Sequence, residues 1–291
     1  MALSIAILNL SVPLLNFSKH SLAVYFSSAE ELIVHSNKKL ITQTNVFKGF
    51  RTIFMLYMFF MEITKFYSPN FDKKKRTTKN IIAIIIHYTG MQSERESLER
   101  LISPKSKVST HFFINRAGKI FRLVKEDYVA WHAGKSKWKN YKNLNKNSIG
   151  IELVNRGHRF GYQNFTKIQI NKLIKLCKHL MKKYRIKKNM ILGHSDIAPL
   201  RKIDPGEKFP WKYLSSNGVG IYPILITKKN NPFNAQIKLF FKYLNKIGYR
   251  YLEIKFKKKI ITNFQRRYRP NNTNGILDQE TMQIAKFLSK K

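Results

Sequence analysis

Short apolar runs separated by helical patterns are the feature that most constrains this fold. "IIAIIIHYTG" (81–90), "SIGIELVN" (148–155) and "KKNMILGHS" (187–195) are rich in branched aliphatic residues, which is typical of buried strands. Between them, "SERESLERLIS" (93–103) and "FTKIQINKLIKLCKHLMKKY" (165–184) have helical spacing. Strands that alternate with helices predict an α/β domain with a mixed central β-sheet flanked by helices.

Local signals mark where these elements begin and turn. A serine precedes the first helical segment and Thr166 precedes the second, and both residue types are good helix N-caps. In "THFFINRAGKIFRLV" (110–124), the turn residues Arg116, Ala117 and Gly118 predict two strands joined by a tight connection.

The pattern divides the chain into four segments. We expect an N-terminal extension at 1–66, an α/β domain at 67–222, a linker at 223–232 and a small three-helix domain at 233–291. The linker contains an Asn-Asn-Pro run. The last segment holds three short amphipathic patterns, "NAQIKLFFKYLNKIGY", "ITNFQRRYRP" and "ILDQETMQIAKFL".

The N-terminal extension carries two apolar stretches to which the sequence assigns no single role. "MALSIAILNLSVPLLNF" lacks a basic start, and "IFMLYMFFM" (53–61) is shorter than the roughly 20 residues of a membrane-spanning helix. Neither is followed by a small-residue cleavage site or by a cysteine for lipid attachment. Two alternatives stay open: an uncleaved export signal, or a true start at Met55, Met58 or Met61.

Composition bounds the class of partner. The formal charge of +39 favours an anionic partner, namely a nucleic acid, an anionic lipid or an acidic polymer. However, the lysines are scattered, and abundant Lys, Asn, Ile, Phe and Tyr together are typical of an AT-rich genome. A nucleic-acid binder would interleave aromatic residues with arginine on one surface. The one cysteine, Cys177, excludes an internal disulfide and a cysteine-based zinc site, and we expect it in the core.

Two of the predicted strands end in histidines, His87 and His194, and Asp204 follows after a proline-containing loop. Strand ends of an open α/β sheet are where such folds build sites. Two neutral imidazoles and one carboxylate are a usual ligand set for one catalytic zinc ion, with a fourth position left for water. The metal can lower the pKa of that water toward about 7.

Two further residues suit hydrolysis. Glu152 is a carboxylate on an otherwise apolar strand, where it needs a partner or a task, and it could act as a general base. Lys202 precedes Asp204 by two positions and could stabilise an oxyanion. Taken singly, each residue is more often structural: a satisfied histidine, a salt-bridged glutamate or a surface lysine.

Five separated motifs then resemble a known family. "IIIHYTGM", "VSTHFFINRAGKIFRLV", "AWHAGKSKW", "NSIGIELVN" and "GHSDIAPLRKIDPGEKFPW" occur in order. Together they resemble the zinc-dependent N-acetylmuramoyl-L-alanine amidases of the amidase-2 family, of the AmpD and AmiD type, over 67–222. The resemblance implies hydrolysis of the amide between the lactyl group of N-acetylmuramic acid and L-alanine in peptidoglycan stem peptides, in cell-wall turnover or recycling.

The resemblance also implies roles. The positions of the zinc ligands are those of His87, His194 and Asp204, and the catalytic positions are those of Glu152 and Lys202.

The residues around the other histidines predict different roles for them. The "AWHAG" motif lies at the rim of the family's substrate cleft, so Trp131 and His132 are candidates for contact with sugar or peptide. We expect His111 to be structural, and His158 and His179 to lie on the surface or on a helix face.

The C-terminal segment resembles the three-helix peptidoglycan-binding module in "FQRRYRP" (264–270) and "GILDQET" (275–281). A non-catalytic peptidoglycan-recognition protein is the alternative function, but it would lack a zinc ligand, and none is missing. We expect a monomer that binds peptidoglycan or muropeptide and no nucleic acid. The expected location is the periplasm or cell envelope, with the cytoplasm as the alternative, and membrane association stays open.

Overall fold

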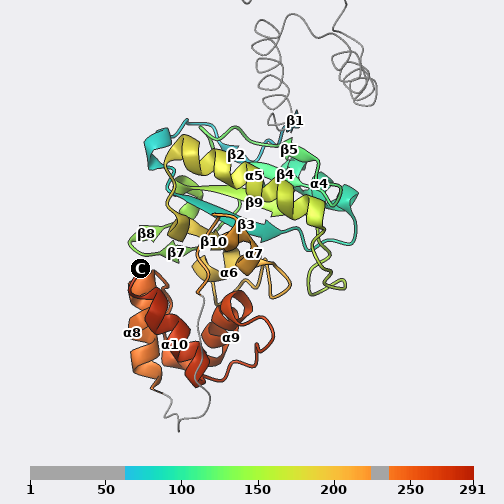
Figure 1. Cartoon of the computed structure of the whole chain (residues 1–291). Coiled ribbons are helices and arrows are strands. Elements are labelled where there is room, and N and C mark those ends of the chain that lie inside the picture. Colours follow the sequence, from blue (N-terminus) through green and yellow to red (C-terminus); the bar gives the residue numbers. More distant parts are fainter. Residues whose placement is uncertain (1–62, 224–235) are drawn as a thin grey trace, which may run out of the picture. The chain divides into compact units, whose positions relative to one another are not determined.

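A six-stranded mixed sheet forms the centre of the fold (Figure 1). The structure is a computed structural model and describes residues 63–223 and 236–291. The strand order is β1-β5-β4-β9-β3-β10, in which β4 and β5 are antiparallel and the other neighbours are parallel. The strands are β1 (Ile63–Lys65), β3 (Ala83–Tyr88), β4 (Phe112–Ile114), β5 (Ile120–Arg122), β9 (Ser148–Leu153) and β10 (Ile191–Gly193).

Two small antiparallel ladders flank the sheet. They pair β2 (Phe71–Asp72) with β6 (Val129–Ala130), and β7 (Lys137–Trp138) with β8 (Tyr141–Lys142). Short 3-10 helices occur in the described connections: η1 (Thr78–Asn80), η2 (Pro104–Ser106), η3 (Leu144–Asn147), η4 (Lys188–Met190) and η5 (Ile254–Phe256).

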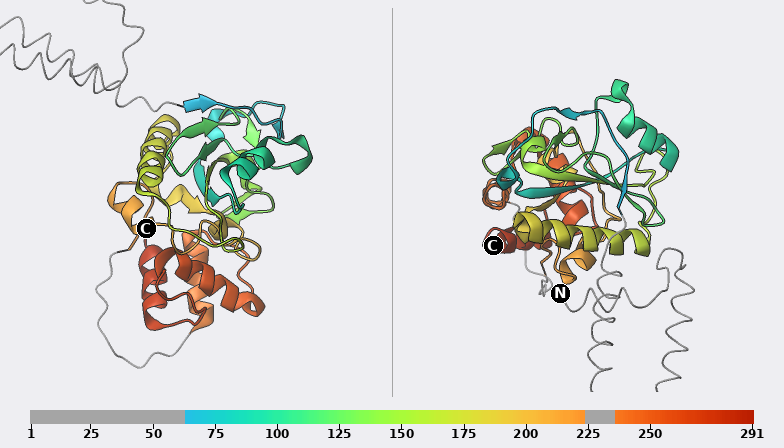
Figure 2. Two further views of the ribbon diagram at one scale, coloured as in Figure 1. Left: turned by 90° about the vertical axis from the view of Figure 1, so that its right-hand side faces the viewer. Right: turned by 90° about the horizontal axis from the view of Figure 1, so that it is seen from above.

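Helices cover both faces of the sheet. Figure 2 shows α5 (Lys167–Tyr184) on one side and α4 (Glu94–Ile102) on the other. The expected caps are present: the Ser93 hydroxyl oxygen accepts from the Glu96 amide at 3.1 Å, and that of Thr166 accepts from the Gln169 amide at 3.2 Å. Each such cap contributes about 1 kcal/mol to helix stability. The mixed α/β fold predicted from the sequence is confirmed.

Alternation along β4 explains the two covered faces. Phe112 and Ile114 belong to the large core that includes the α5 residue Leu173, whereas Phe113 packs with Leu101 of α4. Successive strand side chains point to opposite faces, so a fully apolar strand must be covered twice. Burying each such side chain contributes roughly 1.5–3 kcal/mol.

Three helices follow the residues that the structure does not describe: α8 (Ile237–Ile247), α9 (Lys257–Tyr268) and α10 (Gln279–Leu288). Phe240, Phe264 and Ile284 of these helices share one buried apolar cluster with Ile191 of β10 and Trp211 of α7 (Trp211–Ser216). The described residues, 63–223 and 236–291, belong to one compact unit. The helical C-terminal region is therefore present, and its apolar faces are covered partly by the α/β domain.

Two details differ from the sequence expectations. Strand β1 pairs with β5, so the sheet includes Ile63–Lys65 of the segment assigned to the N-terminal extension. His194 is the first residue of the short helix α6 (His194–Ile197), not the last of a strand. The apolar N-terminal stretches, the alternative start sites and the Asn-Asn-Pro run lie outside the described residues. Within 63–223 and 236–291, no helix combines the length and apolarity needed to cross a membrane.

Candidate metal centre

The register of three neighbouring parallel strands brings the predicted site residues together. In the ladders, His87 at the end of β3 lies opposite Glu152 of β9, and Ile86 lies opposite Gly193 of β10. His194 follows Gly193 directly, so it emerges beside His87. Parallel strands end at the same edge of a sheet, which places all three side chains in one row there.

His87, His194 and Asp204 converge on one point. The Nδ1 atoms of the two histidines are 2.9 Å apart, and the Oδ2 atom of Asp204 lies 3.2 Å from the first and 3.1 Å from the second. All three residues are buried. In a tetrahedral site with zinc–ligand distances of 2.0–2.1 Å, neighbouring ligand atoms are about 3.3 Å apart. The observed triangle fits that size, and these residues form a group able to hold a metal ion.

Proton positions on the two rings show why the three atoms suit a cation. The Nε2 atom of His194 lies 3.1 Å from the carbonyl oxygen of Ala133. A carbonyl oxygen only accepts hydrogen bonds, so this contact is satisfied when Nε2 carries the ring proton. The Arg201 guanidinium, which lies 3.2 Å from Nε2 and can only donate, then donates to the same Ala133 carbonyl. In the neutral ring, Nδ1 is then an unprotonated acceptor that faces the other two ligand atoms.

A chain of hydrogen bonds gives His87 the same tautomer. The Ser148 hydroxyl donates to the Leu144 carbonyl at 2.5 Å, and its oxygen is 3.3 Å from Nε2 of His132. The Nδ1 atom of His132 is in turn 3.0 Å from Nε2 of His87. If Nε2 of His132 donates to the serine oxygen, Nδ1 of His132 accepts from Nε2 of His87. Nδ1 of His87 is then left unprotonated. Neighbouring groups commonly fix metal-binding histidines in this way.

The ionisation of His87 and Asp204 agrees with this picture. Burial and the neighbouring His194 ring lower the pKa of His87 to about 4, so its imidazole is neutral at pH 7. Burial raises the pKa of Asp204, but the two histidines outweigh burial and hold it below its usual range. The neutral His87 ring and the Asp204 carboxylate then face one another as acceptors, an arrangement that a cation relieves.

Glu152 lies beside this group. Its Oε2 atom is buried and has no hydrogen-bond partner among the residues that the structure describes. Burial and the negative charge of Asp204 raise the pKa of Glu152 to about 8, against the opposing effect of Lys202. A buried carboxyl oxygen without a partner is unfavourable for stability, and groups with strongly shifted pKa values are concentrated at functional sites.

Lys202 lies on the loop between α6 and Asp204. The side chain is partly buried, and its charge acts to lower the pKa of both Glu152 and His87. The ammonium group is therefore close enough to influence the pKa values of these residues, and its role in catalysis stays a prediction.

The two residues of the "AWHAG" motif lie differently. His132 is 9% exposed and sits behind His87, on the side away from the three-atom cluster that Nδ1 of His87 faces. Trp131 is partly buried, and its indole nitrogen donates to Asp72 of β2 at 2.7 Å. Contact of either residue with a substrate stays a prediction, although this placement favours a role for His132 in orienting His87.

Three further histidines lie in the part of the chain that the structure describes. His111 is fully buried and accepts from the Gly150 amide at 3.0 Å, as expected of a structural residue. His179 is exposed on α5. His158 makes specific contacts: its ring stacks on Tyr162 with centroids 4.4 Å apart, and its Nε2 atom lies 3.1 Å from the Glu207 carboxylate.

Two residues that the sequence analysis did not single out support the site. A Cβ atom at Gly150 would come within 2.4 Å of the His132 ring, so only glycine leaves room for that ring. Asp196, within "GHSD", is 1% exposed and accepts from the Gly193 amide at 2.7 Å. For Gly150, the sequence did offer a signal, because a glycine inside a strand of β-branched residues often marks a close approach of another group. The partners of Asp196 are distant in sequence and left no local signal.

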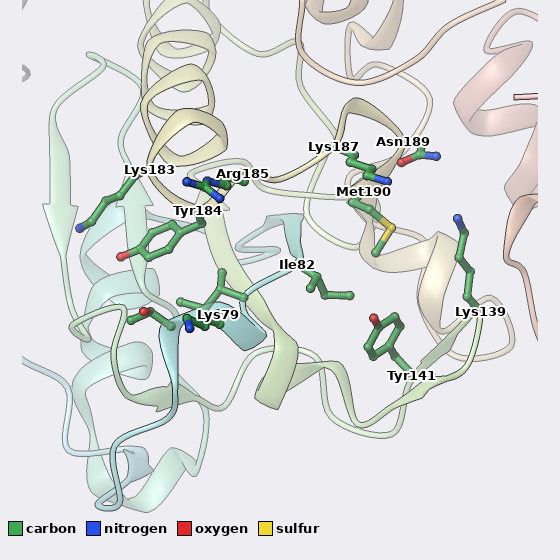
Figure 3. Close-up of a pocket in the computed structure, with 12 residues that line it drawn as sticks. Lys79, Ile82, Lys139, Tyr141, Lys183, Tyr184, Arg185, Lys187, Asn189 and Met190 are labelled. Atoms are coloured by element: carbon green, nitrogen blue, oxygen red, sulfur yellow. The ribbon is translucent and has the colours of Figure 1, made fainter.

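A cavity of about 640 Å³ lies away from this cluster, and Figure 3 shows its lining. It is formed by residues that precede β3 and β10, at the opposite end of these strands from His87 and His194. Its rim carries the basic residues Lys79, Lys139, Lys183, Arg185 and Lys187, with no acidic residue among the described lining. It is therefore separate from the candidate metal centre.

Comparison with known proteins finds one family. Residues 77–207 match Amidase_2, described as N-acetylmuramoyl-L-alanine amidase. N-acetylmuramoyl-L-alanine amidase AmiD of Escherichia coli (strain K12) is 34% identical over 234 residues, 72% of this chain and 83% of that protein. 1,6-anhydro-N-acetylmuramyl-L-alanine amidase AmpD of Haemophilus influenzae is 36% identical over 168 residues, 51% of this chain and 89% of that protein.

Solved structures agree. AmiD from E. coli, in complex with anhydro-N-acetylmuramic acid-L-Ala-D-gamma-Glu-L-Lys, has a TM-score of 0.67 at 32% identity, covering 75% of this chain and 91% of that one. AMPDH3 from Pseudomonas aeruginosa, in complex with anhydromuramic pentapeptide, has a TM-score of 0.64 at 29% identity, covering 75% and 96%.

Proposed function

Because this chain belongs to the family of N-acetylmuramoyl-L-alanine amidases, we propose that its metal is one zinc ion held by His87, His194 and Asp204. The resemblance expected from the sequence motifs is confirmed, and with it the activity of an amidase in cell-wall turnover. The single observation that carries the zinc proposal is the triangle of three buried acceptor atoms, each within 3.2 Å of the others. Nitrogen and carboxylate ligands of this kind suit zinc.

Two side chains carry the proton transfers and the charge. In its carboxylate form, which the charge of Lys202 favours, Glu152 takes a proton from the water that attacks the lactyl carbonyl carbon, and later gives a proton to the departing nitrogen of L-alanine. Lys202 stabilises the negative charge on the former carbonyl oxygen. The carbon–nitrogen bond breaks, leaving a carboxylate on the lactyl group and a free amine on the peptide. Zinc, when bound, supplies a Lewis acid and makes water a better nucleophile at neutral pH.

The substrate class follows from the relatives. AmiD and AMPDH3 are solved with anhydromuramic peptides, so we propose that this chain acts on muropeptides with a stem peptide attached to N-acetylmuramic acid. The basic chain suits the carboxylates of stem peptides. We propose a monomer in the periplasm or cell envelope.

The direct test is hydrolysis of anhydro-N-acetylmuramyl-tripeptide by the purified full-length chain, followed by mass spectrometry. We expect release of the tripeptide with a new amino terminus on L-alanine. Chelation should abolish release, and added zinc should restore it. Binding of the muropeptide without release of peptide by the zinc-loaded chain would instead identify a recognition protein.

The chain from His87 through His132 to Ser148 predicts the effect of replacing His132. The His132→Phe variant keeps a ring of similar size but removes the acceptor for Nε2 of His87. Zinc affinity should fall about 10- to 100-fold, as is usual when a partner of a metal ligand is lost. Competition with a fluorescent chelator measures this affinity. His179→Phe, on the exposed face of α5, is the control and should bind zinc as the wild type does.

A further inference from the structure

The C-terminal helix α9 makes side-chain contacts with the segment 193–207, called the loop below, which carries His194, Lys202 and Asp204. We propose that Asn263 of α9 is a positioning residue, which holds this loop in the geometry that the amidase reaction needs. The inference rests on the proposed function of the loop. It goes beyond a peptidoglycan-binding role for the C-terminal helices, because it makes one of them part of the framework of the active site.

Asn263 contacts the loop backbone directly. The residue is 1% exposed, and its amide nitrogen lies 2.6 Å from the carbonyl oxygen of Pro199 and 3.2 Å from that of Lys202. The second contact is to the main chain of the residue proposed to stabilise the oxyanion. One buried side chain thus anchors both ends of the segment 199–202 from outside the α/β domain.

Neighbouring residues of α9 extend the attachment. Arg266 donates to the Asn263 side-chain oxygen at 2.7 Å, which orients that amide with its nitrogen toward the loop. The same arginine lies 3.3 Å from the carboxylate of Glu207, three residues after Asp204. Arg267 pairs with Asp196 of α6, whose carboxylate also accepts from the Gly193 amide. The helix therefore contacts the segment from 193 to 207 at four points.

Within the loop, backbone bonds run from the Ser195 amide to the Asp204 carbonyl at 2.9 Å, from the Ala198 amide to the His194 carbonyl at 3.0 Å, and from the Arg201 and Lys202 amides to the Ala198 carbonyl at 3.1 Å. The Arg201 side chain donates to the Lys135 carbonyl at 3.0 Å, and Asn263 adds its contacts from the C-terminal helices. A loop of this length without regular structure gains much of its order from contacts with its surroundings. Small displacements of a catalytic group are costly: about 1 Å can lower the rate by about 100-fold. Loss of the Asn263 contacts should therefore affect turnover more than global stability.

Helix α9 offers a matched control in Gln265. This residue is also an amide and is fully buried, but its side-chain nitrogen donates to the Ile276 carbonyl at 2.8 Å, within the C-terminal helices. Its oxygen accepts from the Gly275 amide at 2.8 Å. Asn263→Ala and Gln265→Ala thus each remove a buried amide from the same helix, one facing the catalytic loop and the other facing away from it.

The experiment compares the two variants in the full-length, zinc-loaded chain. For Asn263→Ala we expect kcat to fall at least about tenfold with little change in KM. We also expect faster hydrogen exchange at the amides of Ser195 and Lys202. For Gln265→Ala we expect near wild-type kcat and unchanged exchange at these amides, despite a lower melting temperature.

The outcomes separate this inference from the proposed function. If the wild type hydrolyses muropeptide but both variants have the same kcat and the same exchange in the loop, Asn263 has no positioning role and the inference is wrong. If the wild type releases no peptide, the proposed function fails first, while exchange at Ser195 and Lys202 still tests the attachment.

A second pair of variants keeps the inference testable if the alanine variants do not fold. Asn263→Leu and Gln265→Met keep the side-chain volume and remove only the polar groups. The same contrast in kcat and exchange is expected. Equal behaviour of this pair, with both proteins folded by circular dichroism, overturns the inference even if the alanine variants do not fold.

Discussion

The Glu152→Gln variant is expected to bind one zinc ion as the wild type does, yet to lose about 10²- to 10⁴-fold in kcat, the usual contribution of a general acid–base group. Glutamine keeps the shape of the side chain but cannot accept a proton at neutral pH. Glu152 lies opposite His87 in the β3–β9 ladder, and it is not one of the three convergent ligand residues. In this variant, turnover should therefore fall while the zinc content stays that of the wild type.

Glu126→Gln is the matched control for this prediction. Glu126 is buried, at 7% exposure, and it lies near Lys183 and Arg122, away from the candidate metal centre. The kcat of this variant should remain within about twofold of the wild type, because Glu126 contacts none of the candidate site residues. Peptide release by Glu152→Gln at the wild-type rate would show that another group is the base.

Replacing Arg267 should have the largest effect on stability. Its guanidinium is 4% exposed, pairs with Asp196 at 1% exposure, donates to the Ile191 carbonyl at 3.0 Å and lies 4.1 Å from the centroid of the Trp211 ring. In Arg267→Leu, the Asp196 carboxylate stays buried without its cationic partner. Loss of one member of a buried ion pair lowers the free energy of unfolding by about 3–5 kcal/mol.

Urea denaturation measures this loss, and Arg269→Leu is its control. Arg269 is on the same stretch of chain, but its partners Asp278 and Glu280 are 34% and 44% exposed. That variant should lose only about 1 kcal/mol or less. Adding Asp196→Asn to Arg267→Leu should cost less than the sum of the single changes, because the two side chains interact.

The Arg267 experiment also addresses how the C-terminal helices relate to the rest of the chain. Since residues 63–223 and 236–291 belong to one compact unit that contains a buried ion pair, we expect a single unfolding transition for this unit. Two well-separated transitions, with Arg267→Leu affecting only one of them, would contradict a shared core.

Much of the fold was predictable because its central elements have strong local patterns. Strand β3 is a continuous aliphatic run, and α5 has five turns of helical spacing after Thr166. The two-residue strands, such as β2 and β6, were not predicted, because two residues have no periodicity to detect. Placing His194 at a strand end was wrong by one residue, since α6 begins there.

The site was predictable where chemistry and register coincide, and less so where it depends on distant partners. His87, His194 and Asp204 converge as their strand ends and loop suggested. By contrast, the orientation of His132 depends on space left by Gly150, which is 18 positions later. The role of Asp196 depends on Arg267, 71 positions away. No local pattern reports such pairs, which only the folded chain brings together.

Zinc stoichiometry and coordination test the central claim most directly. Elemental analysis and X-ray absorption of the purified chain should find one zinc with two nitrogen and one oxygen ligands from the protein at about 2.0–2.1 Å. Asp204→Ala should retain less than about a tenth of that zinc, because a three-residue site loses one of its ligands. Undiminished zinc in Asp204→Ala, or full peptide release by the metal-free wild type, would contradict the account.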